Sequence, residues 1–203
     1  AFEVAEWRKD GNGNFVRIGY VVRDMQVNIE SCPARNKPPL LPEVGPFCVE
    51  AGESLEFTVQ ATDPDNDPIE LRAFGGPYLV SNPADPLSTI GSNPAFGTFR
   101  WSTRCTHVRK QPYFLTIEAK DNPAGRSTNL PRLVSLSTVE ITVVAPAPKN
   151  PQAQAAEDVI NLSWDTSICA GANAYKIYRR EGTYGFVPSD CETGVPAYTG
   201  YKV

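Results

Sequence analysis

A short acidic run offers the clearest site for chemistry in this 203-residue chain. Residues 63–68 read Asp-Pro-Asp-Asn-Asp-Pro, which places three carboxylates and one amide within five positions between restrictive prolines. Calcium takes six to eight oxygen ligands, often several carboxylates held on one loop. The run is therefore a candidate calcium loop. The alternative is an Asx-type turn whose aspartates form ion pairs with Arg35 and Lys37.

Cys105 and His107 form the second group, because a thiolate beside an imidazole can act as a nucleophile. His107 is the only histidine of the chain, and no Gly-x-Ser-x-Gly elbow is present. Functional Cys–His pairs meet in space and need a third group that orients the base. A disulfide explains Cys105 more simply. We therefore expect no catalytic residues and a protein that is not an enzyme.

The spacing of the five cysteines is unlike that of a zinc site, which uses short paired spacings. We predict the disulfides Cys48–Cys105 and Cys169–Cys191, with Cys32 paired to a residue upstream of this chain. A Cys32–Cys48 loop is the main alternative, and free thiols in a reducing compartment are another. Disulfides indicate an oxidising, extracellular location.

Composition excludes several classes of partner. The net charge is −4 and the sequence pI about 5.1, so no global positive field would attract nucleic acid. No apolar run approaches the roughly 20 residues that a membrane-spanning helix needs. The 19 prolines and 15 glycines, with 41% apolar residues, are typical of β-modules joined by stiff connectors.

Alternating apolar and polar residues predict strands over 55–61, 113–119 and 139–143. Turn-forming clusters separate them, and no window shows sustained helical periodicity. Short strands at this spacing predict an all-β fold of immunoglobulin-like sandwiches. Residues 2–38 and 113–151 also share one pattern, two strands followed by a proline-rich connector.

This repeat divides the chain into modules. Residues 1–31 should be the C-terminal part of one sandwich, followed by a linker over 32–39. Residues 40–145 should form a complete sandwich, and 146–151 a Pro-rich linker. Residues 152–203 should be the N-terminal part of a third sandwich, because such a module needs about 100 residues.

Three resemblances refine this picture. The middle module resembles a cadherin-type repeat in its motifs Val-Glu-Ala-Gly-Glu (49–53), Ala-Thr-Asp-Pro-Asp (61–65) and Glu-Ala-Lys-Asp (118–121). Ser-Trp-Asp (163–165) and the strand-like Ala174–Arg180 resemble strands B and C of a fibronectin type III domain. The whole chain resembles large Bacteroidota surface proteins of the kind associated with gliding motility and exported by type IX secretion.

The last resemblance depends on motifs spread over most of the chain. They are Glu-Trp-Arg (6–8), Gly-Tyr-Val-Val-Arg-Asp-Met-Gln (19–26), Cys-Val-Glu-Ala-Gly (48–52), Thr-x-Cys-x-His-Val-Arg (103–109), Val-Val-Ala-Pro-Ala-Pro (143–148), Ile-Tyr-Arg-Arg (177–180) and Cys-Glu-Thr-Gly-Val-Pro (191–196). The resemblance implies export and display on a bacterial surface, and it implies no catalytic activity.

The cadherin resemblance implies that calcium is held by Asp63, Asp65 and Asp121 where the module meets the preceding one. The acidic linker that completes the cadherin site is absent, because residues 32–38 read Cys-Pro-Ala-Arg-Asn-Lys-Pro. No other cofactor is implied.

The function that these features predict is a non-catalytic stalk or adhesive segment of a secreted surface protein. Its expected partners are neighbouring modules, surface ligands and other copies, with which it could assemble into filaments. The alternative is a carbohydrate-binding or substrate-docking accessory segment of a secreted enzyme. Buried tryptophans favour the stalk and an exposed aromatic row favours the alternative. We expect Trp164 in a sandwich core, with Trp7 and Trp101 in or beside strands.

Overall fold

The computed structural model describes the chain except for residues 27–35, 124–130, 173, 183–184, 188 and 190–191. It divides the chain into two compact units, Ala1–Arg35 and Asn36–Val203. The described residues contain strands and single 3-10 turns, and no α-helix. None of their elements is a helix long and apolar enough to cross a membrane. The predicted all-β fold is confirmed.

The first unit contains one antiparallel hairpin, β1 (Phe2–Lys9) and β2 (Phe15–Arg23). Asp10 shapes its turn, because its carboxylate accepts the N–H groups of Asn12 and Asn14, both at 2.9 Å. Most side chains of this hairpin are exposed.

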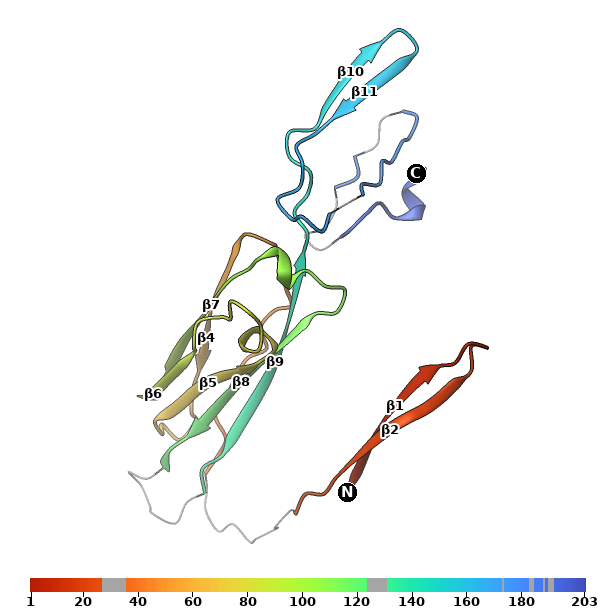
Figure 1. Cartoon of the computed structure of the whole chain (residues 1–203). Coiled ribbons are helices and arrows are strands. Elements are labelled where there is room, and N and C mark those ends of the chain that lie inside the picture. The colour runs from red at the N-terminus through yellow and green to blue at the C-terminus, as the bar shows by residue number, and fades with distance from the viewer. Residues whose placement is uncertain (27–35, 124–130, 173, 183–184, 188, 190–191) are drawn as a thin grey trace. The chain divides into compact units, whose positions relative to one another are not determined.

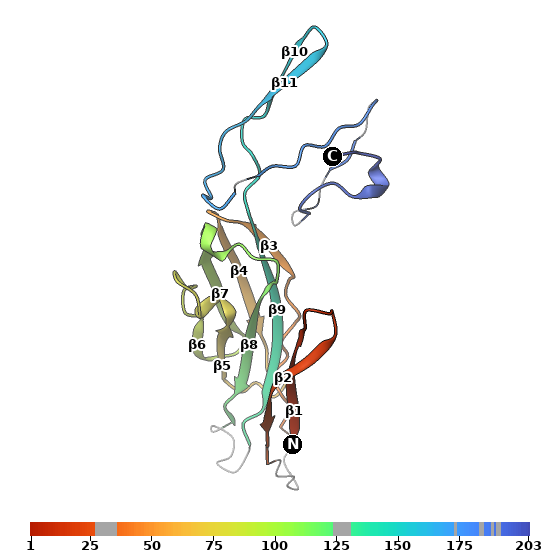
Figure 2. The ribbon, with the colours of Figure 1, turned by 45° about the vertical axis from the view of Figure 1, so that its right-hand side comes forward.

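A two-layered sandwich forms the main body of the second unit (Figures 1 and 2). One sheet has the strand order β3-β9-β8-β5-β6 and the other contains β4 and β7. The strands are β3 (Phe47–Glu50), β4 (Ser54–Ala61), β5 (Ile69–Gly75), β6 (Ser88–Ser92), β7 (Ala95–Ser102), β8 (Tyr113–Asp121) and β9 (Val134–Val144). The three predicted alternating runs lie within β4, β8 and β9.

The sandwich core follows from this alternation. Buried side chains alternate with exposed or half-buried ones along β7 and β8, from Phe57 onward in β4 and from Ser137 onward in β9. Phe99, Trp101, Ile117 and Ile141 are among the fully buried side chains. Neighbouring strands pair antiparallel except for β3, which runs parallel to β9 from Phe47↔Ile141 onward.

The residues after the sandwich form less regular structure. The strands β10 (Gln152–Ala156) and β11 (Val159–Ser163) pair as a hairpin whose side chains are exposed on both faces. The strand expected over 174–180 is not formed, and only Arg179 makes a bridge there, to Lys202. Within the described ranges, the 3-10 turns are η1 (Gly76–Tyr78), η2 (Cys105–His107) and η4 (Ala197–Thr199).

Candidate functional site

The acidic run forms a tight turn between β4 and β5. The Asp63 carboxylate oxygen Oδ1 accepts the backbone N–H of Asp65 at 2.8 Å and that of Asp67 at 3.1 Å. Asn66 takes the left-handed conformation, with φ +66°, which asparagine tolerates better than most residues. The chain therefore wraps around one carboxylate, as the Asx-turn interpretation expects.

Three buried carboxylates meet at this turn. Asp63, Asp67 and Asp121 are 6%, 2% and 0% exposed, and one oxygen from each lies within 4.8 Å of the other two. We call these three residues the acid cluster. Asp63 and Asp121 belong to the set expected for calcium, whereas Asp65 lies outside the cluster and Asp67 takes its place. The carboxylate of Asp65 instead accepts the backbone N–H of Lys37 at 2.7 Å.

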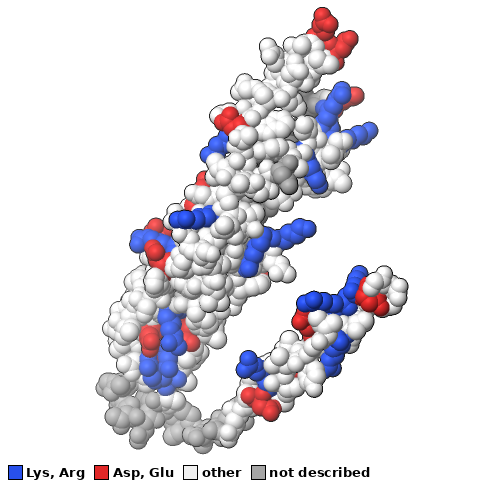
Figure 3. Space-filling view, in the orientation of Figure 1, with Lys and Arg blue, Asp and Glu red and all other residues white. Residues whose placement is uncertain are grey.

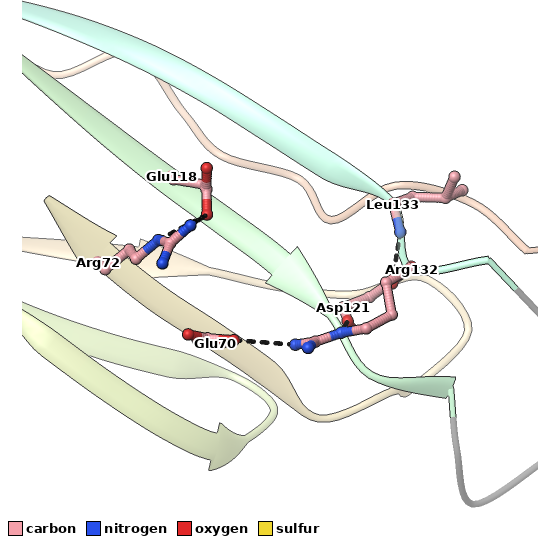
Figure 4. A network of polar contacts seen from close by, with 6 residues as sticks. All are labelled: Glu70, Arg72, Glu118, Asp121, Arg132 and Leu133. Carbon is pink, nitrogen blue, oxygen red and sulfur yellow. Dashed lines mark hydrogen bonds and ion pairs between the residues drawn. The ribbon is translucent and has the colours of Figure 1, made fainter. Parts of the chain in front are cut away.

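Asp121 lies at the end of β8 and is held by hydrogen bonds on both oxygens. The backbone N–H of Leu133 donates to Oδ1 at 2.7 Å, and the Asn36 side-chain amide donates to Oδ2 at 2.7 Å. Arg132 donates to the backbone carbonyl of Asp121 at 2.8 Å and pairs with Glu70 at 2.9 Å (Figure 4). Arg132 thus contacts the backbone at Asp121 and the carboxylate of Glu70.

The surroundings of the cluster shift the pKa of Asp121. Burial raises the pKa of Asp121 above its ordinary value, the hydrogen bonds from Leu133 and Asn36 oppose this shift, and the charges of Asp63 and Asp67 raise it further. On the face shown in Figure 3, Lys and Arg side chains lie among Asp and Glu side chains.

One oxygen of the cluster has no hydrogen-bond partner. Asp63 Oδ2 is buried and unpaired, although Asp63 Oδ1 is saturated by the turn. Leaving a buried acceptor unpaired costs about 1–3 kcal/mol, and more when it is charged. A cation among the three carboxylates would satisfy this oxygen. Calcium–oxygen distances of about 2.3–2.6 Å allow ligand oxygens up to about 5 Å apart, which accommodates the observed 4.8 Å limit.

The opposite end of the sandwich carries a disulfide that the sequence did not reveal. Cys105, in η2, is bonded to Cys169, 64 residues further along the chain, with a Cα–Cα distance of 5.2 Å. The predicted Cys48–Cys105 and Cys169–Cys191 bonds are therefore wrong. Cys48 is disulfide-bonded as well, while Cys32 and Cys191 lie outside the described residues.

This bond connects the sandwich to the segment that follows β11. Cys169 is 5% exposed and belongs to the same apolar cluster as the sandwich core. Its neighbour Ile168 packs over Gly52, so closely that a Cβ at Gly52 would lie 3.1 Å from Ile168 Cδ1. The segment is therefore held by packing as well as by the covalent bond.

His107 is part of the same end and is structural. It is 1% exposed, its Nδ1 accepts the N–H of Arg104 at 3.0 Å, and its Nε2 lies 2.7 Å from the Ser81 carbonyl oxygen. Because Nδ1 accepts, Nε2 donates to the Ser81 carbonyl oxygen. Trp101 stacks near it at 4.9 Å between ring centroids. The thiolate that a Cys105–His107 pair would need is absent, because Cys105 is in the disulfide.

The three tryptophans differ in environment. Trp101 is 1% exposed and donates its indole N–H to the Asn82 carbonyl at 3.2 Å. Trp164 is half-buried against Tyr175, at 5.2 Å between centroids, outside the buried core cluster. Trp7 is 55% exposed on β1. The expected core position of Trp164 is therefore not observed.

Two residues at this site, Asp67 and Asn36, were not among the expected ligands Asp63, Asp65 and Asp121. Asp67 is close in sequence to two of the expected ligands, and the geometry of the turn places its carboxylate in the acid cluster. Asn36 lies 85 residues from Asp121, and its linker was interpreted as lacking ligands because it lacks acids. A local sequence pattern does not predict a contact between residues that lie so far apart in the chain.

No family model matches the chain, and neither does any curated protein. Among solved structures, the chain is similar to a sialic acid binding region of a Streptococcus sanguinis adhesin, bound to 3'sLn. The identity is 16% and the TM-score 0.39, over 58% of this chain and 33% of the adhesin chain. The chain thus spans about a third of that region.

Two other solved structures are similar over a comparable share of the chain. The SrpA adhesin of the same organism has 17% identity and a TM-score of 0.39, over 60% of this chain and 66% of that one. A PKD domain of an M14-like peptidase from a Thermoplasmatales archaeon has 22% identity and a TM-score of 0.36, over 54% and 98%. All these TM-scores lie below 0.5, so the fold assignment is based on this chain's own strands.

Proposed function

We propose that this chain is a non-catalytic stalk segment of a secreted bacterial surface protein, of the Bacteroidota type IX secretion kind. In such a segment, sandwiches separate a functional tip from the cell and must keep their order under tension. The Cys105–Cys169 disulfide is the observation that carries this proposal. It fixes the sandwich to the following segment, and such bonds persist in oxidising compartments.

A pulling experiment tests the mechanical role. With the chain held at its two ends, the oxidised protein should extend less than a C105S/C169S variant, because the bond shields the residues between the two cysteines. A separation of 64 residues at roughly 3.3–3.6 Å each gives a difference of about 220 Å. Equal extensions would show that the bond does not bear load and would remove the main support for a stalk.

The acid cluster adds a second element to the proposed function, a calcium site that stabilises the other end of the sandwich. The observation behind it is the unpaired, buried Asp63 Oδ2 beside two further carboxylates. Bound calcium would replace three mutually repelling buried charges with an attractive set, and the carboxylates of Asp63, Asp67 and Asp121 would hold it.

Thermal unfolding of the whole chain, in calcium and in a chelator, tests this site. Calcium at 100 times its dissociation constant stabilises a protein by about 2.7 kcal/mol. For a unit of this size that raises Tm by about 5–10 °C. Extracellular modules bind calcium with Kd of about 10⁻⁴–10⁻³ M, so 100 times Kd corresponds to about 10–100 mM calcium. The controls are magnesium at the same concentration and a salt of matched ionic strength.

Two matched variants assign the ligands. Asp67→Asn should remove the calcium-dependent rise in Tm, whereas Asp65→Asn should keep it, because only Asp67 belongs to the acid cluster. The reverse result would restore the cadherin-like ligand set. No rise in the unmodified chain would end the calcium proposal and leave the disulfide argument intact.

A carbohydrate-binding accessory role is the second candidate, because one face of the first hairpin carries an exposed aromatic row. Trp7, Phe15 and Tyr20 are 55%, 66% and 61% exposed, and the strand register places them on one face. Arg17 lies over the Tyr20 ring at 4.2 Å. A glycan array probed with the chain and with a Trp7→Ala variant tests this. Binding that the variant loses would favour this role over the stalk.

A further inference from the structure

One edge of β9 is only partly covered by a neighbouring strand. On one side, β8 pairs with β9 over residues 134–141. On the other side, β3 pairs with it only from residue 141 onward (Figure 2). Residues 41–46 precede β3, and in the described part of the chain no backbone hydrogen bond joins them to β9. Residues 134–139 therefore lack a partner strand on this side.

Alternate residues of β9 present their backbone groups to this free edge. The Val144 carbonyl oxygen accepts a hydrogen bond on the β3 side, whereas the Leu133 carbonyl oxygen accepts one from β8. The register of β8 with β9 has no bulge, and successive residues of a strand face opposite sides. The N–H and C=O groups of Leu136 and Thr138 therefore point away from β8 and have no backbone partner among the described residues.

This edge lacks the features that usually prevent a free edge from pairing. Proteins protect such edges with lysines, prolines or bulges. Residues 134–140 read Val-Ser-Leu-Ser-Thr-Val-Glu, without lysine or proline, and their register with β8 is regular. The prolines lie instead in the adjacent segment, where Pro42 and Pro46 have no N–H to donate to β9. The edge is therefore competent to accept one more strand.

An open groove of about 670 Å³ lies along the free edge. Residues 41 and 43–46 line one side of it, and residues 136–138 and 140 line the other. Gly45 lies against the core, since a Cβ added there would be 3.1 Å from Val139 Cγ1. A strand in this groove would pair with β9 in line with β3.

The groove carries apolar and acidic side chains. Leu136 is 61% exposed and Leu41 is half-buried, whereas Glu43 and Glu140 are exposed carboxylates. Neither carboxylate forms an ion pair with a described residue, and no lysine or arginine lines the groove. The groove is therefore complementary to a ligand that combines an apolar group with a positive charge.

We propose that the groove beside β9 binds an extended peptide segment of another protein, which pairs with Leu136 and Thr138 as an added strand. Strand addition takes affinity from backbone hydrogen bonds and specificity from alternate side chains. Leu136 and Glu140 are four residues apart on the outer face of β9. The added strand should therefore carry an apolar residue beside Leu136 and, four positions away, a lysine or arginine within reach of Glu140 and Glu43.

Two short peptides are the probes, because the added strand has two possible directions. Lys-Val-Thr-Val-Leu places its lysine beside Glu140 in the antiparallel direction, and Leu-Val-Thr-Val-Lys does so in the parallel direction. Both carry blocked ends, flanking Gly-Ser pairs and a fluorescent label, and anisotropy measures their binding to the whole chain. One of them should bind, and replacing its lysine with glutamate should weaken binding at least about tenfold, because like charges then meet.

Amide hydrogen exchange followed by NMR locates the bound peptide. In the free chain, the N–H groups of Leu136 and Thr138 should exchange faster than those of Ser137 and Val139, which face β8. Peptide at ten times its Kd leaves about one site in eleven free, so exchange at Leu136 and Thr138 should slow about tenfold. Binding that leaves these two amides unprotected, or that protects amides of β4 instead, overturns the proposal.

Four variants test the backbone and charge contributions separately. Thr138→Pro removes an N–H at the free edge and should weaken peptide binding at least about fivefold. Leu136→Lys covers the case in which that variant does not fold, and should also weaken binding because an edge lysine opposes pairing. Glu140→Gln should weaken binding about two- to fivefold. Glu56→Gln, the matched change on the exposed face of β4, should leave binding unchanged.

Two further outcomes would overturn the proposal. One is that neither lysine peptide binds the unmodified chain at millimolar concentration. The other is that exchange at Leu136 and Thr138 slows as the chain is concentrated without peptide, because a second copy would then occupy the edge. The stalk and calcium proposals stand in both cases, since neither uses the free edge of β9.

Discussion

Removing the Cys105–Cys169 disulfide should cost the sandwich a large part of its stability. The appropriate variant is C105S/C169S, in which both sulfurs are replaced and no free thiol remains. A reducing agent would be less informative, because Cys48 is also disulfide-bonded and would be reduced too. The double variant removes the Cys105–Cys169 bond alone and leaves the disulfide of Cys48 in place.

The expected size of the effect follows from the loop that the bond closes. In the chain-entropy model, a cross-link over about 64 residues removes about 14 cal/mol/K from the unfolded chain, or about 4 kcal/mol at 25 °C. At about 2–4 °C per kcal/mol for a unit of this size, Tm should fall by about 8–17 °C. The folded state loses little packing, because serine nearly matches cysteine in shape.

Urea unfolding at fixed pH, followed by tryptophan fluorescence, measures this change. Trp101 is buried beside the bonded end and reports whether the core opens. Peptide mapping without reduction gives the control, since trypsin should yield the fragment 105–109 joined to the fragment 150–176. A mapped bond whose removal changes the free energy of unfolding by less than about 1 kcal/mol would refute the loop-closure argument.

Three further predictions concern the sandwich alone. Without calcium, the raised pKa of Asp121 means that the fold is more stable when this carboxyl is protonated. This contribution to the free energy of unfolding should be complete below about pH 3.8 and should be lost as pH rises through the folded-state pKa. Asp121→Asn should flatten this pH dependence, measured by urea unfolding at a series of pH values. Trp101→Ala should lower the free energy of unfolding by about 3–5 kcal/mol, measured by urea denaturation; a loss below 1 kcal/mol would contradict its core role. Gly75→Ala should lower Tm measurably, because Gly75 has φ +129° and an added Cβ would collide with the Phe114 carbonyl oxygen; an unchanged Tm would show that the strand end relaxes freely.

The central strands were predictable because one face of each is buried. Period-two alternation over 55–61, 113–119 and 139–143 records which side chains face the core, and β4, β8 and β9 contain these runs. The parallel pairing of β3 with β9 is not predicted by any such alternation. The path of residues 41–46 decides which strand β3 pairs with. The alternation of apolar and polar residues does not predict this path.

The segment over 174–180 shows the limit of the same signal. Its Tyr-x-Ile-Tyr pattern is suitable for a strand, yet a strand also needs a neighbour that accepts and donates backbone hydrogen bonds. Only Arg179 has such a neighbour among the described residues, in Lys202. Alternation therefore predicts which side chains could share a face, and a partner strand decides whether the strand forms.

The prediction of the cysteine pairing was wrong for a related reason. Two cysteines can bond when their Cα atoms lie about 4.4–6.8 Å apart, and sequence spacing says nothing about that distance. Cys105 lies in a 3-10 turn at one end of the sandwich, and Cys169 lies at the same end, where its neighbour Ile168 packs over Gly52. This contact belongs to the folded chain and has no counterpart in the spacing of the cysteines.

The exchange of Asp65 for Asp67 in the acid cluster follows from the turn itself. The Asp63 carboxylate accepts the N–H groups of both later aspartates, which curls the backbone around it. Asp65 lies at the partly exposed apex of this curl and accepts the Lys37 N–H, whereas Asp67 comes at its end, two residues before β5 begins, and is 2% exposed. An Asp-x-Asp motif therefore specifies the turn, while the strand that follows selects which carboxylate becomes buried. For this reason Asp67 and Asp65 form the decisive pair of variants for the calcium site.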